Sequence, residues 1–310
     1  MRDPRDLYTF ESADLAAAVP RGRLPLVHAL PGIVDAGGAC RIATTYLFDS
    51  LRHVRLVGFD IDELIDYRGS RPQAEFDGAT FAEIEMPRLD LHLMYDEVDR
   101  PFLLLSGPEP DLQWQRLAQA IIDLVEYFDV DEVVSMNAVP MAVPHTRPIG
   151  LITHVNMCAL ENGDHEVAPG DGRITVPAAF GALLEKELDR AGHAAYGYVA
   201  QVPHYLTRSD FPAGALALLR RVSRSTGLEI PLVDLGDLSS AASAALVHTL
   251  EDNEEVQSVV HALEDSYDRL ADDTGTGGLA TTMDMPTAAE LGDRFERFLA
   301  HRDDDGPLGS

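Results

Sequence analysis

From Leu24 onward, short apolar runs alternate with longer helical stretches, and no other feature of the sequence constrains the fold as much. The runs at 24–30, 54–59 and 102–105 have the length of strands, whereas the stretch after Ala39 carries apolar residues at helical spacing. This alternation is typical of proteins in which helices cover a largely buried sheet. We therefore expect an α/β fold with a mixed, mostly parallel sheet.

The same patterns locate the individual elements. Helices are expected from Ala39, from Asp111 as an N-cap, from Pro177 as a first helical residue, and between Pro212 and Gly227. A long loop is expected over the proline-rich segment 140–148. Expected strands span 24–30, 54–59, 80–86, 89–95, 102–105, 132–136, 151–155, 196–202 and 230–235, with 80–86 and 89–95 forming an antiparallel pair across Pro87-Arg88.

After Gly236 the pattern predicts helices only. A helical hairpin is expected over 239–250 and 253–270, followed by a linker at 271–285 and an amphipathic helix at 286–300. Residues 251–310 hold 16 acids against 4 bases, so this end of the chain is strongly acidic. We therefore divide the chain into an α/β/α domain at 1–236 and an acidic helical extension at 237–310.

The charge balance excludes several function classes. With 52 acids against 24 bases, the net charge of −28 repels phosphate backbones and anionic lipid heads, so we expect neither nucleic-acid nor membrane binding. The start of the chain has no apolar signal segment, and no run approaches the ~20 apolar residues that span a bilayer. We expect a cytoplasmic protein. Two cysteines, Cys40 and Cys158, are too few for a disulfide framework and lack zinc-site spacing.

The turn between the first strand and the first long helix is rich in glycine. It runs from Pro31 to Gly38, and its candidate ligand- or partner-binding residues are Gly32, Asp35, Gly37 and Gly38. Backbone amides at such a helix start can hold an anion. The turn lacks the Lys-Ser/Thr end of a P-loop and the glycine spacing of a dinucleotide fingerprint, and Asp35 would repel phosphate. A tight packing turn is the alternative interpretation.

A second set of polar residues follows predicted strands in the middle of the chain. Ligands of open α/β sheets bind at the carboxyl ends of strands, so polar residues there are binding candidates. Hydrogen bonds to loop carbonyls are the alternative. The set consists of Asn137, His145, His154, Asn156, His204 and Tyr205, with Arg41 and Arg147 as available phosphate-binding bases.

Complete catalytic and metal-binding patterns are missing from the sequence. No Gly-x-Ser-x-Gly elbow is present, and the nine-residue spacing of His145 and His154 fits no regular metal-ligand pattern. We therefore expect no catalytic residue, no metal and no cofactor.

Four segments carry a family resemblance. The sequence at 30–37, with the helix that ends at 46–51, resembles the opening of the proteasome assembly chaperone 2 family. The segments 132–140, 177–184 and 202–205 are similar to later parts of that family, the last in its actinobacterial branch. The resemblance covers about Leu24 to Leu235, and the helical hairpin is similar to the extension of that branch.

The resemblance implies a three-layer α/β/α fold related to nucleoside phosphorylases, with no established catalytic residues. It also implies a homo-oligomer, which we expect to be a trimer by similarity to the fold relatives, and protein partners such as proteasome subunits. Several relatives dock through a C-terminal hydrophobic–Tyr–any-residue motif, from which the ending Pro307-Leu308-Gly309-Ser310 departs. Two functions stay open: a non-enzymatic protein-binding or assembly factor, or a binding protein or enzyme that takes a nucleoside or phosphorylated metabolite in a phosphorylase-like cleft.

Overall fold

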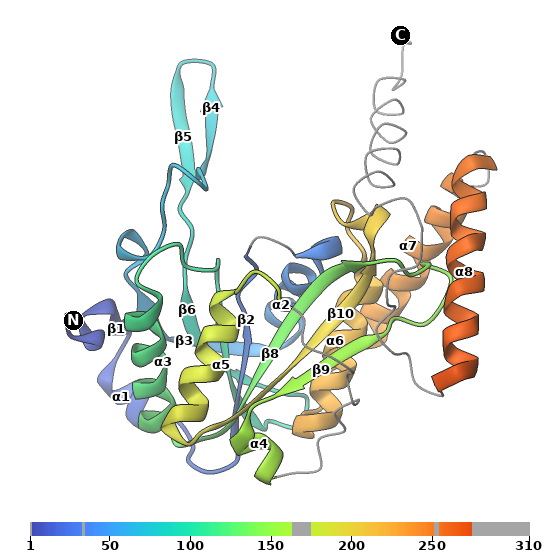
Figure 1. The fold of residues 1–310 in the computed structure, drawn as a ribbon. Coiled ribbons are helices and arrows are strands. Elements are labelled where there is room, and N and C mark those ends of the chain that lie inside the picture. Colours follow the sequence, from blue (N-terminus) through green and yellow to red (C-terminus); the bar gives the residue numbers. More distant parts are fainter. Residues whose placement is uncertain (1, 33–34, 163–174, 251–253, 275–310) are drawn as a thin grey trace.

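A mixed sheet of eight strands organises the computed structural model, which describes residues 2–32, 35–162, 175–250 and 254–274. The strands lie in the order β1-β3-β6-β7-β2-β8-β10-β9, and the four strands β7, β2, β8 and β10 are parallel neighbours (Figure 1). Since β3 lies antiparallel to β6, and β6 to β7, five of the eight strands share one direction, as expected for a mostly parallel sheet. The strands are β1 (Tyr8–Phe10), β2 (Leu24–Ala29), β3 (Arg52–Phe59), β6 (Asp90–Tyr95), β7 (Pro101–Ser106), β8 (Val130–Met141), β9 (Leu151–Val155) and β10 (Ala194–Pro203).

Helices cover both faces of this sheet, which confirms the three-layer α/β/α expectation. One face packs against α1 (Ala13–Ala17), α3 (Trp114–Phe128) and α5 (Phe180–Ala191), and the other against α2 (Ala39–Ser50) and α6 (Pro212–Thr226) (Figure 1). The six residues of β2 are all buried and alternate between the two apolar cores. The short α4 (Met157–Asn162) contacts β10.

The region after Gly236 is helical, as expected, and the pairing of its two helices as a hairpin stays a prediction. Helix α7 (Val233–Leu250) packs on α6, and α8 (Glu254–Thr274) follows it. The predicted linker begins inside α8, and its remainder, like the expected helix at 286–300, lies outside the described residues. The division of the chain at residue 236 stays a prediction. Across the described ranges, none of the helices is long and apolar enough to cross a membrane.

The expected pairing of 80–86 with 89–95 is wrong. Strand β5 (Thr80–Glu85) pairs with β4 (Gln73–Asp77), and together they form a separate two-stranded hairpin that projects away from the body (Figure 1). Strand β6 pairs instead with β3 and β7 inside the main sheet. The two turn residues are Gly78 and Ala79, and the signal for this hairpin was Gly78, since glycine at the first position favours a two-residue hairpin turn and Gly78 has a φ of +57°.

Several predicted boundaries also need correction. Helix α3 begins at Trp114, because the Asp111 carboxylate accepts a hydrogen bond from the Asp66 amide instead of capping the helix. Helix α5 begins at Phe180, three residues after Pro177. The run 230–235 is no strand, since α7 begins within it. Strand β8 extends to Met141, so the expected loop at 140–148 starts later.

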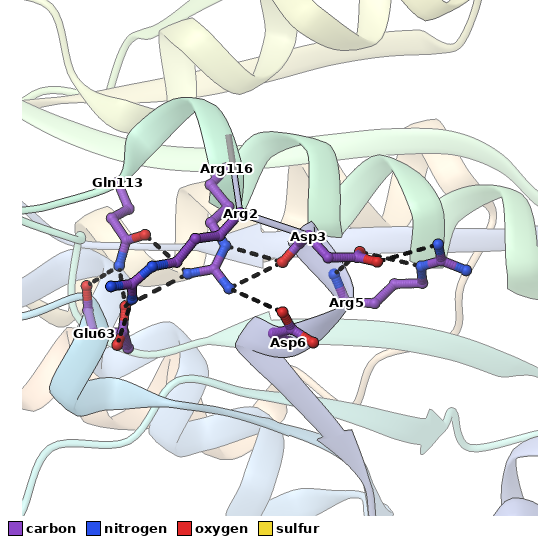
Figure 2. A network of polar contacts seen from close by, with 7 residues as sticks. All are labelled: Arg2, Asp3, Arg5, Asp6, Glu63, Gln113 and Arg116. Carbon is purple, nitrogen blue, oxygen red and sulfur yellow. Dashed lines mark hydrogen bonds and ion pairs between the residues drawn. The ribbon is translucent and has the colours of Figure 1, made fainter.

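The N-terminal segment is fastened to the body by a buried arginine. Arg116 on α3 is 5% exposed and donates two hydrogen bonds to the Asp3 carbonyl, of 3.0 and 2.9 Å (Figure 2). Its third nitrogen donates to Gln113 at 2.9 Å and pairs with Glu63 at 3.5 Å. The 3-10 helices η1 (Pro4–Leu7) and η3 (Ile61–Glu63) are thereby joined to α3, and β1 is held at the edge of the sheet.

Candidate functional site

The glycine turn after β2 is packed tightly into the protein. Asp35 caps α2, because its carboxylate accepts hydrogen bonds from the amides of Cys40 at 2.8 Å and Arg41 at 3.0 Å. Gly37 has a φ of +65°, and a Cβ there would lie 2.8 Å from the Cβ of Phe211. The turn therefore needs glycine at position 37 for both conformation and space.

The amides of Gly37 and Gly38 in this turn already have partners. Gly37 donates to the Thr207 carbonyl at 2.9 Å and accepts from the Phe211 amide at 2.8 Å, and the Gly38 amide donates to Asp35. The Glu109 carboxylate fills the space where Gly32 would carry a side chain, and it accepts a hydrogen bond from the Phe180 amide at the start of α5. These contacts belong to a packing turn. Anion binding here would require amides to leave their present acceptors, and the binding role of Gly32, Asp35, Gly37 and Gly38 stays a prediction.

His145, His204 and Tyr205 are brought together at the carboxyl end of the parallel strands, beside that turn. The Tyr205 hydroxyl lies 2.9 Å from the His145 amide and 2.8 Å from its Nδ1. His204, in η4 (His204–Leu206), places Nδ1 3.4 Å from the Met141 carbonyl. Burial raises the pKa of Tyr205 and lowers the pKa of both histidines. The Nε2 atoms of both histidines are buried without a hydrogen-bond partner.

Arg147, considered as a phosphate-binding base, is held by acids of α8. It pairs with Glu264 at 3.1 Å and, through two nitrogens, with Asp268 at 2.8 and 2.7 Å. This bidentate contact holds the pKa of Asp268 below its usual range. The Tyr267 hydroxyl also donates to the Pro148 carbonyl at 3.1 Å. These contacts hold α8 on the loop between β8 and β9, and sequence reasoning had identified none of the α8 residues.

The other three candidates lie apart from this cluster. Strand β9 runs antiparallel to β10. Asn156 follows the last residue of β9, so it lies at the opposite end of the strands from the cluster. There the Asn156 side chain accepts from the amides of Ala159 and Ala195, which is a structural capping role. His154 and Asn137 lie within β9 and β8, and His154 Nδ1 is 2.6 Å from the Glu185 carboxylate. Asn137 and His154 thus lie inside their strands and not after them as expected, and Asn156 lies at the end of the sheet away from His145, His204 and Tyr205.

An open hollow lies elsewhere, between α2 and strands β3 and β6. Its volume is about 700 Å³, and Arg55 and Arg88 line it on either side of the Asp90 carboxylate. The rings of Phe48 and His92 meet edge to face in its wall, with centroids 4.9 Å apart. Burial lowers the pKa of His92 to about 4, so this imidazole is neutral at pH 7. No residue of this hollow was among the predicted candidates.

The β4–β5 hairpin exposes apolar side chains on a projecting arm. Phe76 and Phe81 are 60% and 69% exposed, with ring centroids 5.2 Å apart, and Ile84 is 53% exposed. All residues of both strands are exposed. Clustered apolar exposure of this kind is typical of interaction surfaces. In the described part of the chain, no three His, Cys, Asp or Glu residues lie together as metal ligands would.

Comparison with known proteins gives the family. A model of the PAC2 family matches residues 29–257. A Mycobacterium tuberculosis protein of unknown function is 38% identical, with a TM-score of 0.77 over 86% of this chain and 92% of that one. A Corynebacterium glutamicum protein of unknown function is 36% identical, with a TM-score of 0.79 over 86% and 99%. A proteasome-assembly chaperone homologue of M. tuberculosis is 26% identical, with a TM-score of 0.69 over 76% and 100%.

Curated proteins gave no match. The family model covers most of the chain, including β8, β10 and the glycine turn's helix α2, and the two actinobacterial structures share the fold at more than a third sequence identity. The chain therefore belongs to the PAC2 family.

Proposed function

We propose that this protein is a protein-binding or assembly factor that works as a homo-oligomer, with proteasome subunits as candidate partners. Membership of the PAC2 family supports a chaperone-like role. A relative that is 26% identical is described as a proteasome-assembly chaperone homologue, which gives the partner class its support.

The β4–β5 hairpin is the observation that carries the proposal. A two-stranded hairpin without further packing is only marginally stable in water. This hairpin nevertheless presents Phe76, Phe81 and Ile84 to solvent. A second protein surface would bury these side chains and stabilise the arm.

A second copy of the chain is the occupant that charge favours. Residues 73–86 carry Glu75, Asp77, Glu83 and Glu85 and no Arg or Lys. The hollow at the base of the arm carries Arg55 and Arg88, which share the single Asp90 carboxylate between them, and an aromatic wall. An acidic apolar arm on one copy and an arginine-bearing hollow on the next make a head-to-tail contact, which closes into a ring when the rotation allows. A trimer is the smallest such ring beyond a dimer, and we retain it as the expected state.

Light scattering coupled to size-exclusion chromatography tests this assembly. The wild-type chain is expected to elute as an oligomer, and the double variant Phe76→Ser/Phe81→Ser as a monomer. The matched control is Val98→Ser/Met157→Ser, which changes two side chains that are each 56% exposed and lie outside the arm. A monomeric wild type, or a double variant with the wild-type mass, would contradict the proposed assembly.

The partner class is tested separately, by affinity purification of the tagged full chain from its own host with quantitative mass spectrometry. Stoichiometric proteasome subunits, absent from a tag-only control, are the expected result. Recovery of the chain with no other stoichiometric protein would contradict the partner and leave only the self-assembly. The Phe76→Ser/Phe81→Ser variant, purified in parallel, shows whether partner capture requires the oligomer.

A further inference from the structure

A row of polar residues crosses the centre of the sheet on the face covered by α5. His28 on β2 lies opposite Ser135 on β8 in the strand register. Ser135 in turn lies opposite Gly197 on β10, and Gly197 lies opposite His154 on β9. Registered neighbours point to the same face of a sheet, so their side chains form one line. The surrounding positions on this face, such as Leu26, belong to the apolar core.

Gly197 leaves one space that the side chains of both Ser135 and His154 enter, without a hydrogen bond between Ser135 Oγ and His154 Nε2. A Cβ at position 197 would lie 1.9 Å from Ser135 Oγ and 2.5 Å from His154 Nε2, so both side chains occupy the space that a side chain on β10 would fill. The other ring nitrogen of His154, Nδ1, is 2.6 Å from the Glu185 carboxylate on α5. Glu185 thus orients the imidazole, and Nε2 is the nitrogen on the side of Ser135.

Two buried polar atoms in this row have no hydrogen-bond partner. Ser135 and His28 are each 4% exposed, and neither Ser135 Oγ nor His28 Nδ1 has a partner. A buried polar atom without a partner is destabilising, so each one calls for a functional explanation. Burial, with a smaller contribution from His154, lowers the pKa of His28 to about 4. His28 is therefore neutral at pH 7 and has one ring N–H to donate.

We propose that Ser135, His154 and Glu185 form a nucleophilic site that cleaves small carboxylic esters, with His28 donating to the oxyanion. This activity is additional to the protein-binding role. The arrangement has the parts that acyl transfer requires: a hydroxyl nucleophile, a base that faces the same space, a carboxylate that orients the base, and a neutral donor on the other side. Ser135 Oγ and His154 Nε2 make no hydrogen bond in the resting structure, and catalytic contacts of this kind often tighten only when substrate binds.

The reaction balances without a further reagent except water. Ser135 Oγ attacks the ester carbonyl carbon while its proton passes to His154 Nε2. The alcohol leaves with that proton as the C–O bond breaks, and the acyl group stays on Ser135. Water then adds to the acyl carbon, loses its proton to His154, and releases the acid as that proton returns to Ser135 Oγ.

Burial restricts the substrate to a short acyl group. Ser135 lies beneath α5, whose Gly181 position comes within 3.5 Å of the His28 ring. His154 lies on β9, the last strand of the sheet, and its side chain is 37% exposed. The exposed His154 marks the β9 edge as the approach to Ser135, and the burial of the row makes acetyl-sized esters the substrates to test.

A small fluorophosphonate probe tests the site, because it forms a covalent bond with an activated serine. We expect one probe per wild-type chain, on Ser135, and none on Ser135→Ala. Ser135→Ala removes an unpaired hydroxyl, so its fold is expected to remain as stable as the wild type's. The matched control Ser223→Ala changes a half-buried serine on α6 and is expected to react as the wild type does.

Variants of His154 and Glu185 are expected to slow labelling by the probe to different degrees. His154→Gln is expected to slow labelling by about 100-fold or more, the usual effect of removing a general base. Glu185 is a positioning residue, so Glu185→Gln should also slow labelling, whereas Glu185→Asp should restore part of the rate at an unchanged unfolding midpoint. An unlabelled wild type, a probe on another serine, or wild-type rates in His154→Gln would each overturn the proposal.

Discussion

The N-terminal segment and the β4–β5 hairpin join the same half of the sheet but are held in opposite ways. β1 pairs with β3 at the sheet edge, and Leu7 and Arg116 beneath it are 0% and 5% exposed. In the sequence the hairpin lies between β3 and β6, and all residues of its two strands are exposed. Strand formation alone therefore does not bring a segment into the body, and buried anchoring contacts decide which segment packs.

This difference separates two sources of stability. The N-terminal segment gains its stability within the chain, from the contacts of Arg116 with Asp3 and Gln113 (Figure 2). The hairpin has its Phe76–Phe81 contact and its turn, and a second surface is the source of further stability that we propose for it. Substitutions in the first region should lower the free energy of unfolding, and substitutions in the second should change association.

The largest effect is expected from Arg116→Ala. The substitution leaves the Asp3 carbonyl without its donor and opens space in α3, so the free energy of unfolding should fall by about 3 kcal/mol. Urea unfolding of the purified variant measures this loss. Arg2→Ala is the control, because Arg2 is 72% exposed and its ion pair with Glu63 should contribute less than about 0.5 kcal/mol. Equal losses in the two variants would contradict the anchoring role of Arg116.

The next effect concerns His28, a buried group at the centre of the sheet. Its folded pKa of about 4 lies below the value of about 6.5 in the unfolded chain, so the unfolded state binds a proton more readily. The stability that neutral His28 contributes is therefore full above pH 6.5 and is lost as the pH falls toward 4. Between pH 7 and pH 5 this group should account for about 2 kcal/mol of lost stability.

Urea unfolding at both pH values tests that expectation. His28→Gln should unfold with a pH dependence that is smaller by this amount, whatever its stability at pH 7. His261→Gln, which changes a histidine that is 74% exposed, serves as the control and should keep the wild-type pH dependence. If His28→Gln also keeps the wild-type pH dependence, the stability lost at low pH comes from the titration of other groups.

A smaller loss is expected from Asp35→Ala. This carboxylate accepts from two amides in the first turn of α2, and losing such a cap costs about 1 kcal/mol. Thermal or urea unfolding of the variant measures the loss, with Asp35→Asn as the variant that keeps a capping oxygen. A loss that is the same in both variants would point to the charge of Asp35 and not to its hydrogen bonds.

The sequence predicted the layers of the fold better than the partners of its strands. The apolar stripe of α3 and the buried run of β2 depend on local periodicity, and both were predicted correctly. The partner of β5 depends on the turn at Gly78-Ala79, a signal that the alternation of apolar residues does not carry. Asp111 does not cap α3, because its carboxylate accepts a hydrogen bond from the amide of Asp66, which is distant in sequence.

The sequence predicted only those parts of the candidate site that depend on neighbouring parallel strands. His145, His204 and Tyr205 met because β8 and β10 are parallel, which the pattern of buried strands indicated. Asn156 lies at the opposite end of the strands because β9 is antiparallel to β10. The sequence of a short strand does not indicate whether it pairs in the parallel or the antiparallel direction. Nor could Arg147 be assigned to α8, since the register between a loop and a distant helix is set by tertiary packing.

The smallest effect on the free energy of unfolding is expected from Phe81→Ser in the hairpin. Because Phe81 is 69% exposed, its removal uncovers little new surface, and unfolding of the dilute monomer should change by less than about 0.5 kcal/mol. At high protein concentration the same substitution should lower the unfolding midpoint, since burial of the ring by a second copy stabilises only the assembled wild type. Unfolding curves over a hundredfold range of concentration separate the two cases. A midpoint that is independent of concentration in the wild type would mean that the hairpin, unlike the N-terminal segment, is stabilised by neither its own chain nor another copy.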